Sequence, residues 1–215
     1  MAQLDTQQAE TAVAGGSALE SFAAVGAVVL AILGIVRVVP GYMASIGTIV
    51  VGAALLAEGG VFGVPAATQP MPGTQNTRVQ RQLGGAASAG TFGGAAGVVL
   101  GILALLGLAP VTLTAIAVIV FGGALLLSGG GNSVLGRIAA RNVLDPNVAQ
   151  TMRETADTIS GALVLAGLAA VALGILALLG LTPMLLVLIA LLCVGGALLL
   201  SSSAVASAMT YIREH

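Results

Sequence analysis

Two apolar runs of 34 residues, each interrupted by one proline, constrain this chain more than any other feature. Residues 97–130 and 170–203 align without gaps at an offset of 73 and are identical at 21 of 34 positions, including the proline and several glycines. Residues 27–60 form a more divergent third copy, at an offset of 70 from residues 97–130. The chain is therefore predicted to contain three repeats of one apolar unit.

Each run is too long for a single membrane span. A continuous helix of 34 residues would measure about 50 Å, whereas the hydrocarbon core of a bilayer is about 30 Å thick. Proline lacks an amide donor and disfavours a helical conformation in the preceding residue, so Pro40, Pro110 and Pro183 are predicted to be hairpin tips. Two helices of about 18 residues in each run give six spans, and helices are favoured over strands because the runs lack polar–apolar alternation.

The composition is that of a membrane chain. Of the 215 residues, 58% are hydrophobic and 7% are charged, and the mean hydropathy is +1.10. So few charges cannot coat a soluble domain of this size, which excludes a water-soluble enzyme and a nucleic-acid-binding protein. The absence of lysine and the abundance of Ala, Gly, Leu and Val indicate a GC-rich prokaryote or archaeon, or one of their viruses.

We therefore predict an all-α integral membrane protein with six transmembrane helices, arranged as three repeated proline-tipped hairpins with short amphipathic connector helices. Residues 64–82 are interpreted as a loop ending in a short helix, and Asp145-Pro146 is interpreted as a helix start. The predicted order is a polar N-terminal segment (1–20), hairpin 1 (21–60), a polar connector (61–92), hairpin 2 (93–130), an amphipathic connector (131–160), hairpin 3 (161–203) and a C-terminal tail (204–215).

The arginines predict the orientation. Six of the seven lie in the connectors or the C-terminal tail, and only Arg37 lies near a tip. Because short cytoplasmic loops carry the basic residues, both termini and both connectors are predicted to face the cytoplasm, or the interior of an enveloped particle. The predicted location is a cell membrane or a virion membrane. The tip segments LGLAPVTL and LGLTPMLL are too apolar for open water, so a neighbouring subunit, another protein or the headgroup layer is expected to cover them.

Small residues recur every four positions in the first helix of each hairpin, and glycines mark the second helix. Such a stripe lets helix backbones approach closely in lipid, where no hydrophobic force drives helices together. Two interpretations remain open: self-assembly through contacts between hairpins or subunits, and packing inside one bundle. The predicted helix-packing residues are Ala23, Ala27, Ala31, Gly93, Gly97, Gly101, Ala166, Ala170 and Gly174 in the first helices, and Gly52, Gly122, Gly123, Gly195 and Gly196 in the second helices.

Arg37 and Glu58 are the only charged residues at the edges of an apolar hairpin. Ionisable residues in membrane segments are functional candidates. A helix of roughly 27 Å separates these two, so they cannot pair within one hairpin. Each is expected to extend its charged group to its own membrane surface. A Glu58 that faced a cavity would instead bind a proton or a cation.

The sequence contains no recognisable catalytic or metal-binding constellation. Cys193 aligns with Val50 and Val120, which favours an apolar buried role, and His215 has no second ligand beside it. The serines at 201–203 have no accompanying base. We therefore predict no enzymatic activity, no cofactor and no metal.

Two of the repeats share a longer motif, which consists of GILALLGL, a proline, an apolar run and GGALLLS. It occurs at Gly101 to Pro110 with Gly122 to Gly129, and at Gly174 to Pro183 with Gly195 to Ser201. This motif resembles the HdeD-like short-repeat family of prokaryotic membrane proteins. The resemblance implies three helical hairpins with a proline at each tip, in a membrane protein with a stress-related role.

These features favour a structural or accessory integral membrane protein that packs through small-residue helix faces into a homo-oligomer or a larger membrane assembly, including a virion membrane component. The alternative is a small channel or transporter built from three parallel hairpin repeats, because internal repeats are common in such folds. Against it, the third hairpin offers only Thr182 and Cys193 as polar lining groups between Gly161 and Leu200. The expected partners are the lipid bilayer, further copies of the chain and other membrane subunits, with no nucleic acid.

Overall fold

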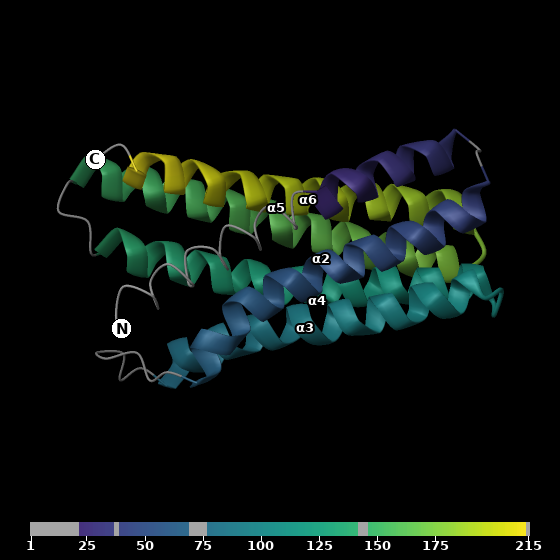
Figure 1. Ribbon diagram of the computed structural model, residues 1–215, viewed down its shortest axis with the longest axis horizontal. Coiled ribbons are helices and arrows are strands. Elements are labelled where there is room, and N and C mark those ends of the chain that lie inside the picture. The colour runs from purple at the N-terminus through teal and green to yellow at the C-terminus, as the bar shows by residue number, and fades with distance from the viewer. Residues whose placement is uncertain (1–21, 37–38, 69–76, 142–145, 214–215) are drawn as a thin grey trace.

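The computed structural model describes residues 22–36, 39–68, 77–141 and 146–213, with side chains described for residues 22–36, 39–57, 88–129, 150–151 and 153–201. Within these ranges the chain forms helices and no strand (Figure 1). The helices are an N-terminal helix (Phe22–Ile35), α2 (Pro40–Thr68), α3 (Thr77–Leu105), α4 (Pro110–Arg141), α5 (Pro146–Leu178) and α6 (Pro183–Arg213). The predicted all-α fold class is confirmed.

Five of these helices are long and apolar enough to cross a membrane. Their apolar windows have mean hydropathies from 1.6 to 2.8 and are Pro40–Ala57, Ser88–Leu105, Pro110–Gly129, Arg153–Leu178 and Pro183–Ser201. The 20-residue window of α4 is about 30 Å long, which matches the thickness of a bilayer core. The N-terminal helix is apolar but shorter than these windows in its described part. The chain is thus a multi-pass membrane protein.

The long helices α2 to α6 differ from the prediction of separate, short connector helices. They contain 29 to 33 residues each, instead of about 18. α4 runs unbroken from Pro110 to Arg141, and the helix expected to start at Pro146 continues into the membrane span as α5. No proline lies between Val111 and Asp145, so nothing forces α4 to stop at the membrane boundary.

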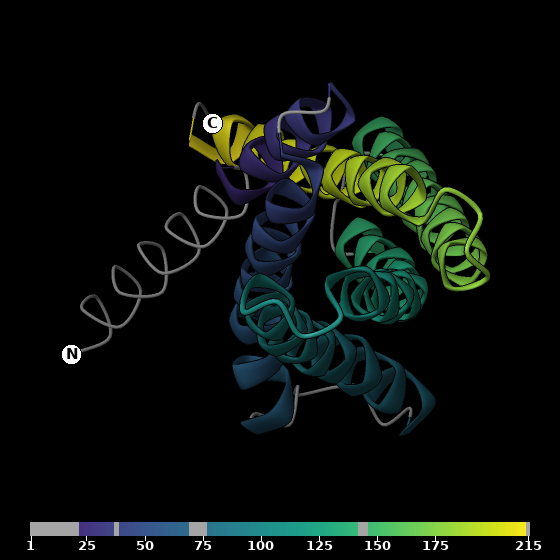
Figure 2. The ribbon, with the colours of Figure 1, turned by 90° about the vertical axis from the view of Figure 1, so that its right-hand side faces the viewer.

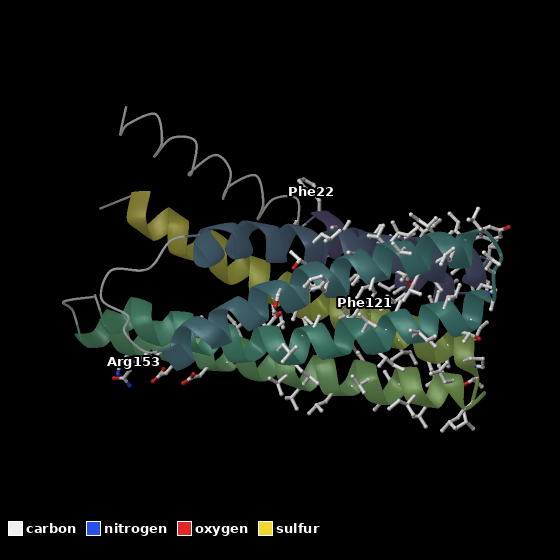
Figure 3. The ribbon with its side chains drawn as sticks, turned by 90° about the horizontal axis from the view of Figure 1, so that it is seen from below. Phe22, Phe121 and Arg153 are labelled. Carbon is white, nitrogen blue, oxygen red and sulfur yellow. The ribbon has the colours of Figure 1, made fainter. Side chains whose placement is uncertain are left out.

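The helices α2, α4 and α6 form the centre of the bundle. Each contacts the other two, while α3 lies against α2 and α4, and α5 lies against α4 and α6. Figure 2 views the bundle from the end at which the three central helices begin, here named the tip end. The opposite end, where α4 ends and α5 begins, is named the connector end and carries Arg153 (Figure 3).

Apolar side chains fill the bundle interior at corresponding positions of the three apolar runs. Phe121 of α4 is fully buried and lies between the helices, whereas Phe22 projects outward (Figure 3). Corresponding residues are fully buried on all three central helices, for example Leu55, Leu125 and Leu198, or Val51, Phe121 and Val194. The three central helices therefore contribute side chains of matched position to one buried apolar core.

Glycines end α3 and α5 at the tip end. Gly107 and Gly180 both have a φ of 85°, a left-handed conformation that glycine adopts without steric cost. The amide of Gly107 donates to the carbonyl of Ala104 at 3.1 Å, and the amide of Leu108 donates to the carbonyl of Leu103 at 3.2 Å. This pair of bonds is a Schellman motif, which supplies donors to the last carbonyls of α3. The corresponding residue of the first repeat is Arg37, which lies outside the described residues.

The prolines predicted as tips are the first residues of α2, α4 and α6. The residue before each proline has a positive φ, which is 48° for Val39, 41° for Ala109 and 38° for Thr182. Its carbonyl accepts a hydrogen bond from the next helix, as in the 3.1 Å bond from the amide of Leu113 to Ala109. Proline suits this first helical position because its missing amide would have no partner there. Between α3 and α4, and between α5 and α6, the turn is thus fixed within four residues.

Candidate functional site

The helices α2 and α3 touch through their backbones at Gly52 and Gly94. A Cβ atom placed on Gly52 would lie 2.8 Å from the carbonyl oxygen of Gly94 and from the amide nitrogen of Val98. A Cβ atom on Gly94 would lie 2.6 Å from the carbonyl oxygen of Gly52. Real Cβ atoms do not approach backbone this closely, so neither position accepts a side chain without moving a helix. We name this contact the first seam.

The same contact recurs between α4 and α5, at Gly122 and Gly167. A Cβ atom on Gly122 would lie 2.6 Å from the carbonyl oxygen of Gly167, and one on Gly167 would lie 2.7 Å from the carbonyl oxygen of Gly122. In the repeat alignment, Gly122 corresponds to Gly52 and Gly167 corresponds to Gly94. This second seam therefore joins equivalent residues in the same register as the first seam.

A third contact of the same register joins α6 to the N-terminal helix. Gly195 corresponds to Gly52 and Gly122, and a Cβ atom placed on it would lie 3.1 Å from Cγ2 of Val28 and 3.5 Å from the carbonyl oxygen of Ala24. Ala24 takes the position that glycine holds in the other two seams and is fully buried. Because its methyl group keeps the backbones farther apart, the third seam is the loosest of the three.

One further glycine in α3 and one in α5 extend the first two seams toward the tip end. A Cβ atom on Gly101 would lie 2.6 Å from Cγ1 of Ile49, and one on Gly174 would lie 2.6 Å from Cγ1 of Ile119. These pairs again occupy equivalent positions of the repeats. Their counterpart in the N-terminal helix is Ala31, which is buried. The first two seams are therefore close over about two helical turns.

The remaining glycines of the predicted stripe in α3 face α4. A Cβ atom on Gly93 would lie 2.8 Å from Cβ of Ala124, and one on Gly97 would overlap the ring of Phe121. Gly97 thus leaves space for a large side chain, whereas the corresponding pairs in the other repeats are Ala27 with Val51 and Ala170 with Val194. A small glycine facing a large phenylalanine fills about the same total volume as an alanine facing a valine, as close-packed interiors require.

Most of the predicted helix-packing residues lie inside the bundle. The buried ones are Ala27, Ala31, Ala170, Gly52, Gly93, Gly97, Gly101, Gly122, Gly174 and Gly195, and Ala23 and Ala166 are partly buried against the core. Gly123 and Gly196 differ, because a Cβ atom on either would meet nothing within 4 Å. Each lies one residue after a seam glycine. Adjacent residues of a helix differ by about 100° around the helix axis, so these two glycines face the outside of the bundle.

Three partners in these seams were missed by the sequence analysis. Ala24, Gly94 and Gly167 come one residue after the first positions of the predicted stripes and correspond to one another in the alignment. Each of them is small in all three repeats, but so are the stripe positions beside them, so the alignment alone does not identify them. The stripe at every fourth residue is divided between two neighbours, since Gly93 and Gly97 face α4 and Gly101 faces α2.

Buried hydroxyl groups in the described residues donate to backbone carbonyls. Thr48 donates to Ala44 at 2.7 Å and Thr114 donates to Pro110 at 2.7 Å, each within its own helix. Ser160 of α5 donates to the carbonyl of Gly129 in α4 and so joins the two helices at the end of the second seam. These bonds supply the partners that buried hydroxyl groups require in an apolar interior.

The side-chain positions of the two charged candidates, Arg37 and Glu58, are not described. Arg37 lies outside the described residues, and Glu58 lies in α2 with its side chain outside them. Cys193 is partly exposed on α6. Within the part of the chain that the structure describes, no three His, Cys, Asp or Glu residues gather as metal ligands.

Comparisons with protein families, with curated proteins and with solved structures find no match to this chain.

Proposed function

We propose that this chain is a structural or accessory integral membrane protein, which assembles with further copies of itself or with other membrane subunits, including those of a virion membrane. The observation that carries the proposal is the packed apolar interior of α2, α4 and α6, in which the described hydroxyl groups bond to backbone carbonyls. Solute pathways are lined by polar or charged groups, so this interior supports a packing role better than a channel or transporter.

The proposed architecture is a closed ring of three proline-tipped hairpins with six spans, in which the N-terminal helix supplies the sixth. Its support is the register of the three seams, because each second helix of a hairpin meets the first helix of the next hairpin at equivalent residues. The third seam, at Gly195, would return the chain to its own first hairpin. A ring closed in this way uses the small-residue faces for internal packing.

The surface proposed for assembly is the outer face of α4 and α6 around Gly123 and Gly196. Exposed Ile116 and Leu127 lie on the same face of α4 as Gly123. A glycine with open space beside apolar side chains lets a helix of a neighbouring subunit approach closely, as small residues do at helix contacts in lipid. The stripes inside the bundle cannot take this role, because their space is already filled.

Native mass spectrometry in mild detergent tests this assembly. The natural chain is expected to give an oligomer, and the double variant Gly123→Leu with Gly196→Leu is expected to give mainly monomer with an unchanged helix content. An oligomer that survives in the double variant would refute the proposed surface. A clean monomer of the natural chain, with measurable solute flux in vesicles that Glu58→Gln abolishes, would instead establish the transporter alternative.

The proposed orientation places the connector end in the cytoplasm or in the interior of a virion. Its support is Arg153, together with the arginines in the polar ends of the other helices, at positions 78, 81, 137, 141 and 213. Reporter fusions to the C-terminal tail and to the loop at Pro110 would check this orientation. At the tail, a reporter that works only in the cytoplasm is expected to be active, and a reporter that works only outside it is expected to be inactive. Membership of the HdeD-like family stays a prediction.

A further inference from the structure

The tip end of the bundle exposes large apolar side chains. Leu106 and Leu179 are each 71% exposed, and they are equivalent residues of the second and third repeats. Val36, Val39, Leu108 and Leu181 are more than half exposed at the same end. At the connector end, by contrast, the exposed residues of α5 are polar and include Arg153 (Figure 3), Glu154 and Thr155. The two ends of the molecule therefore suit different surroundings.

The tip loops are too constrained to turn these side chains inward. The Schellman bonds of Gly107 and Leu108, with the positive φ of Ala109, leave no free residue between α3 and α4. The loop from Leu179 to Thr182 has positive φ values at the same two positions, Gly180 and Thr182. The leucines are thus held facing outward at the tip end.

The helix lengths fix the depth at which the tips lie. The apolar windows of α2, α4 and α6 start at the tip prolines, and the 20 residues of the α4 window extend about 30 Å from Pro110. With the connector end of that window at one edge of the hydrocarbon core, the tip reaches the other edge and does not pass beyond it. The exposed leucines therefore lie at the level of the far headgroup layer.

The backbone at the tips requires polar acceptors as well as apolar surroundings. The first-turn amides of α2 and α4 have no acceptor within their own helix, and the preceding Val39 and Ala109 carry no side-chain oxygen to cap them. An apolar face of another protein would offer these amides nothing. The headgroup layer offers ester and phosphate oxygens next to acyl chains, so it matches both needs.

We propose that the tip end is a lipid-binding surface, embedded in the headgroup layer of the leaflet opposite the connector end. The partner is the phospholipid itself, and the surface comprises the loops that contain Leu108 and Leu181 with the helix starts beside them. The bundle is thus anchored at its tip end by lipid contact and at its connector end by water-exposed charge. This inference depends on the membrane spans and is independent of the proposed oligomer.

Single tryptophans test the proposal, because the natural chain contains none. We would place Leu108→Trp or Leu181→Trp in vesicles of phosphatidylcholine, with Thr155→Trp at the connector end as the matched water-exposed control. The tip tryptophans are expected to emit at shorter wavelength than the control. Lipids brominated near the headgroup should quench them, and aqueous iodide should quench only the control.

Every other pattern would overturn the proposal. Iodide quenching of Leu108→Trp as strong as that of Thr155→Trp, with iodide on both sides of the membrane, would place the tip in water. Resistance to both brominated lipid and iodide would place it under another protein. Leu108 and Leu181 lie on different loops and are exposed, so either variant alone keeps the test valid if the other fails to fold.

Discussion

Gly122 and Gly123 are neighbours in α4 with opposite surroundings. A Cβ atom on Gly122 would collide with the backbone of α5, whereas one on Gly123 would enter open space. The two residues are identical in type and lie at the same depth, so only the direction in which they face separates them. The comparison shows that glycine content by itself does not distinguish a contact inside the bundle from one available to a partner.

Gly195 provides an intermediate case. It occupies the seam position of α6, but its nearest neighbours are side-chain atoms of the N-terminal helix at 3.1 and 3.4 Å, and the nearest backbone atom is at 3.5 Å. Side chains can shift by a few tenths of an ångström, while a backbone shift requires the movement of a whole helix. Substitutions at Gly122, Gly195 and Gly123 should therefore have effects of decreasing size.

The largest effect is expected for Gly122→Ala. Its methyl group would lie 2.6 Å from the carbonyl oxygen of Gly167, so α4 and α5 must separate along the second seam. We expect a loss of about 2–3 kcal/mol in the free energy of unfolding, which is the upper part of the range for overpacking. Thermal unfolding of the purified protein in mild detergent measures it. A midpoint equal to that of the natural chain would refute the seam.

A smaller loss is expected for Gly195→Ala. The new methyl group meets Cγ2 of Val28, which can move slightly to accommodate it. The expected loss is about 1 kcal/mol or less, because a flexible side chain absorbs the overlap. The same unfolding measurement should place this variant between Gly122→Ala and the natural chain. A loss equal to that of Gly122→Ala would mean that the third seam is as close as the second.

No loss is expected for Gly123→Ala. Its methyl group has open space, and alanine favours the helix over glycine by up to about 1 kcal/mol. The unfolding midpoint should stay constant or rise. A clear fall, measured in monomeric protein, would contradict the outward direction assigned to this residue. The corresponding substitution Gly196→Ala on α6 provides a second test of the same point.

The sequence predicted the helix starts at the tips because proline acts locally. Pro40, Pro110 and Pro183 each begin a helix, and the apolar windows follow directly from them. The length of the helices was not predicted, since residues beyond the apolar windows continue the helices, to Thr68 in α2 and to Arg141 in α4. Hydropathy marks where a helix leaves the hydrocarbon core, and it carries no information on where that helix ends.

The partner of each glycine was the hardest feature to predict. Gly93 and Gly94 are adjacent, yet Gly93 faces α4 and Gly94 faces α2. A rotation of about 100° per residue decides between these partners, and a stripe of small residues fits either face. The repeat alignment does not resolve the ambiguity, because both positions are small in every copy: Ala23, Gly93 and Ala166 at one, and Ala24, Gly94 and Gly167 at the other. Which second helix they meet depends on the tertiary arrangement.

Closure of the ring by the N-terminal helix is the central claim, and a cysteine pair tests it directly. A Cβ atom on Gly195 would lie 3.4 Å from Cβ of Ala27, close to the separation of about 3.5–4.5 Å found in disulfides. In a Cys193→Ala background, Ala27→Cys with Gly195→Cys should form an intramolecular disulfide in intact membranes, seen as a mobility change on non-reducing gels. Ala27→Cys with Gly196→Cys, whose second cysteine faces outward, should not. Absence of the first crosslink, or its appearance only between two chains, would contradict the closed ring.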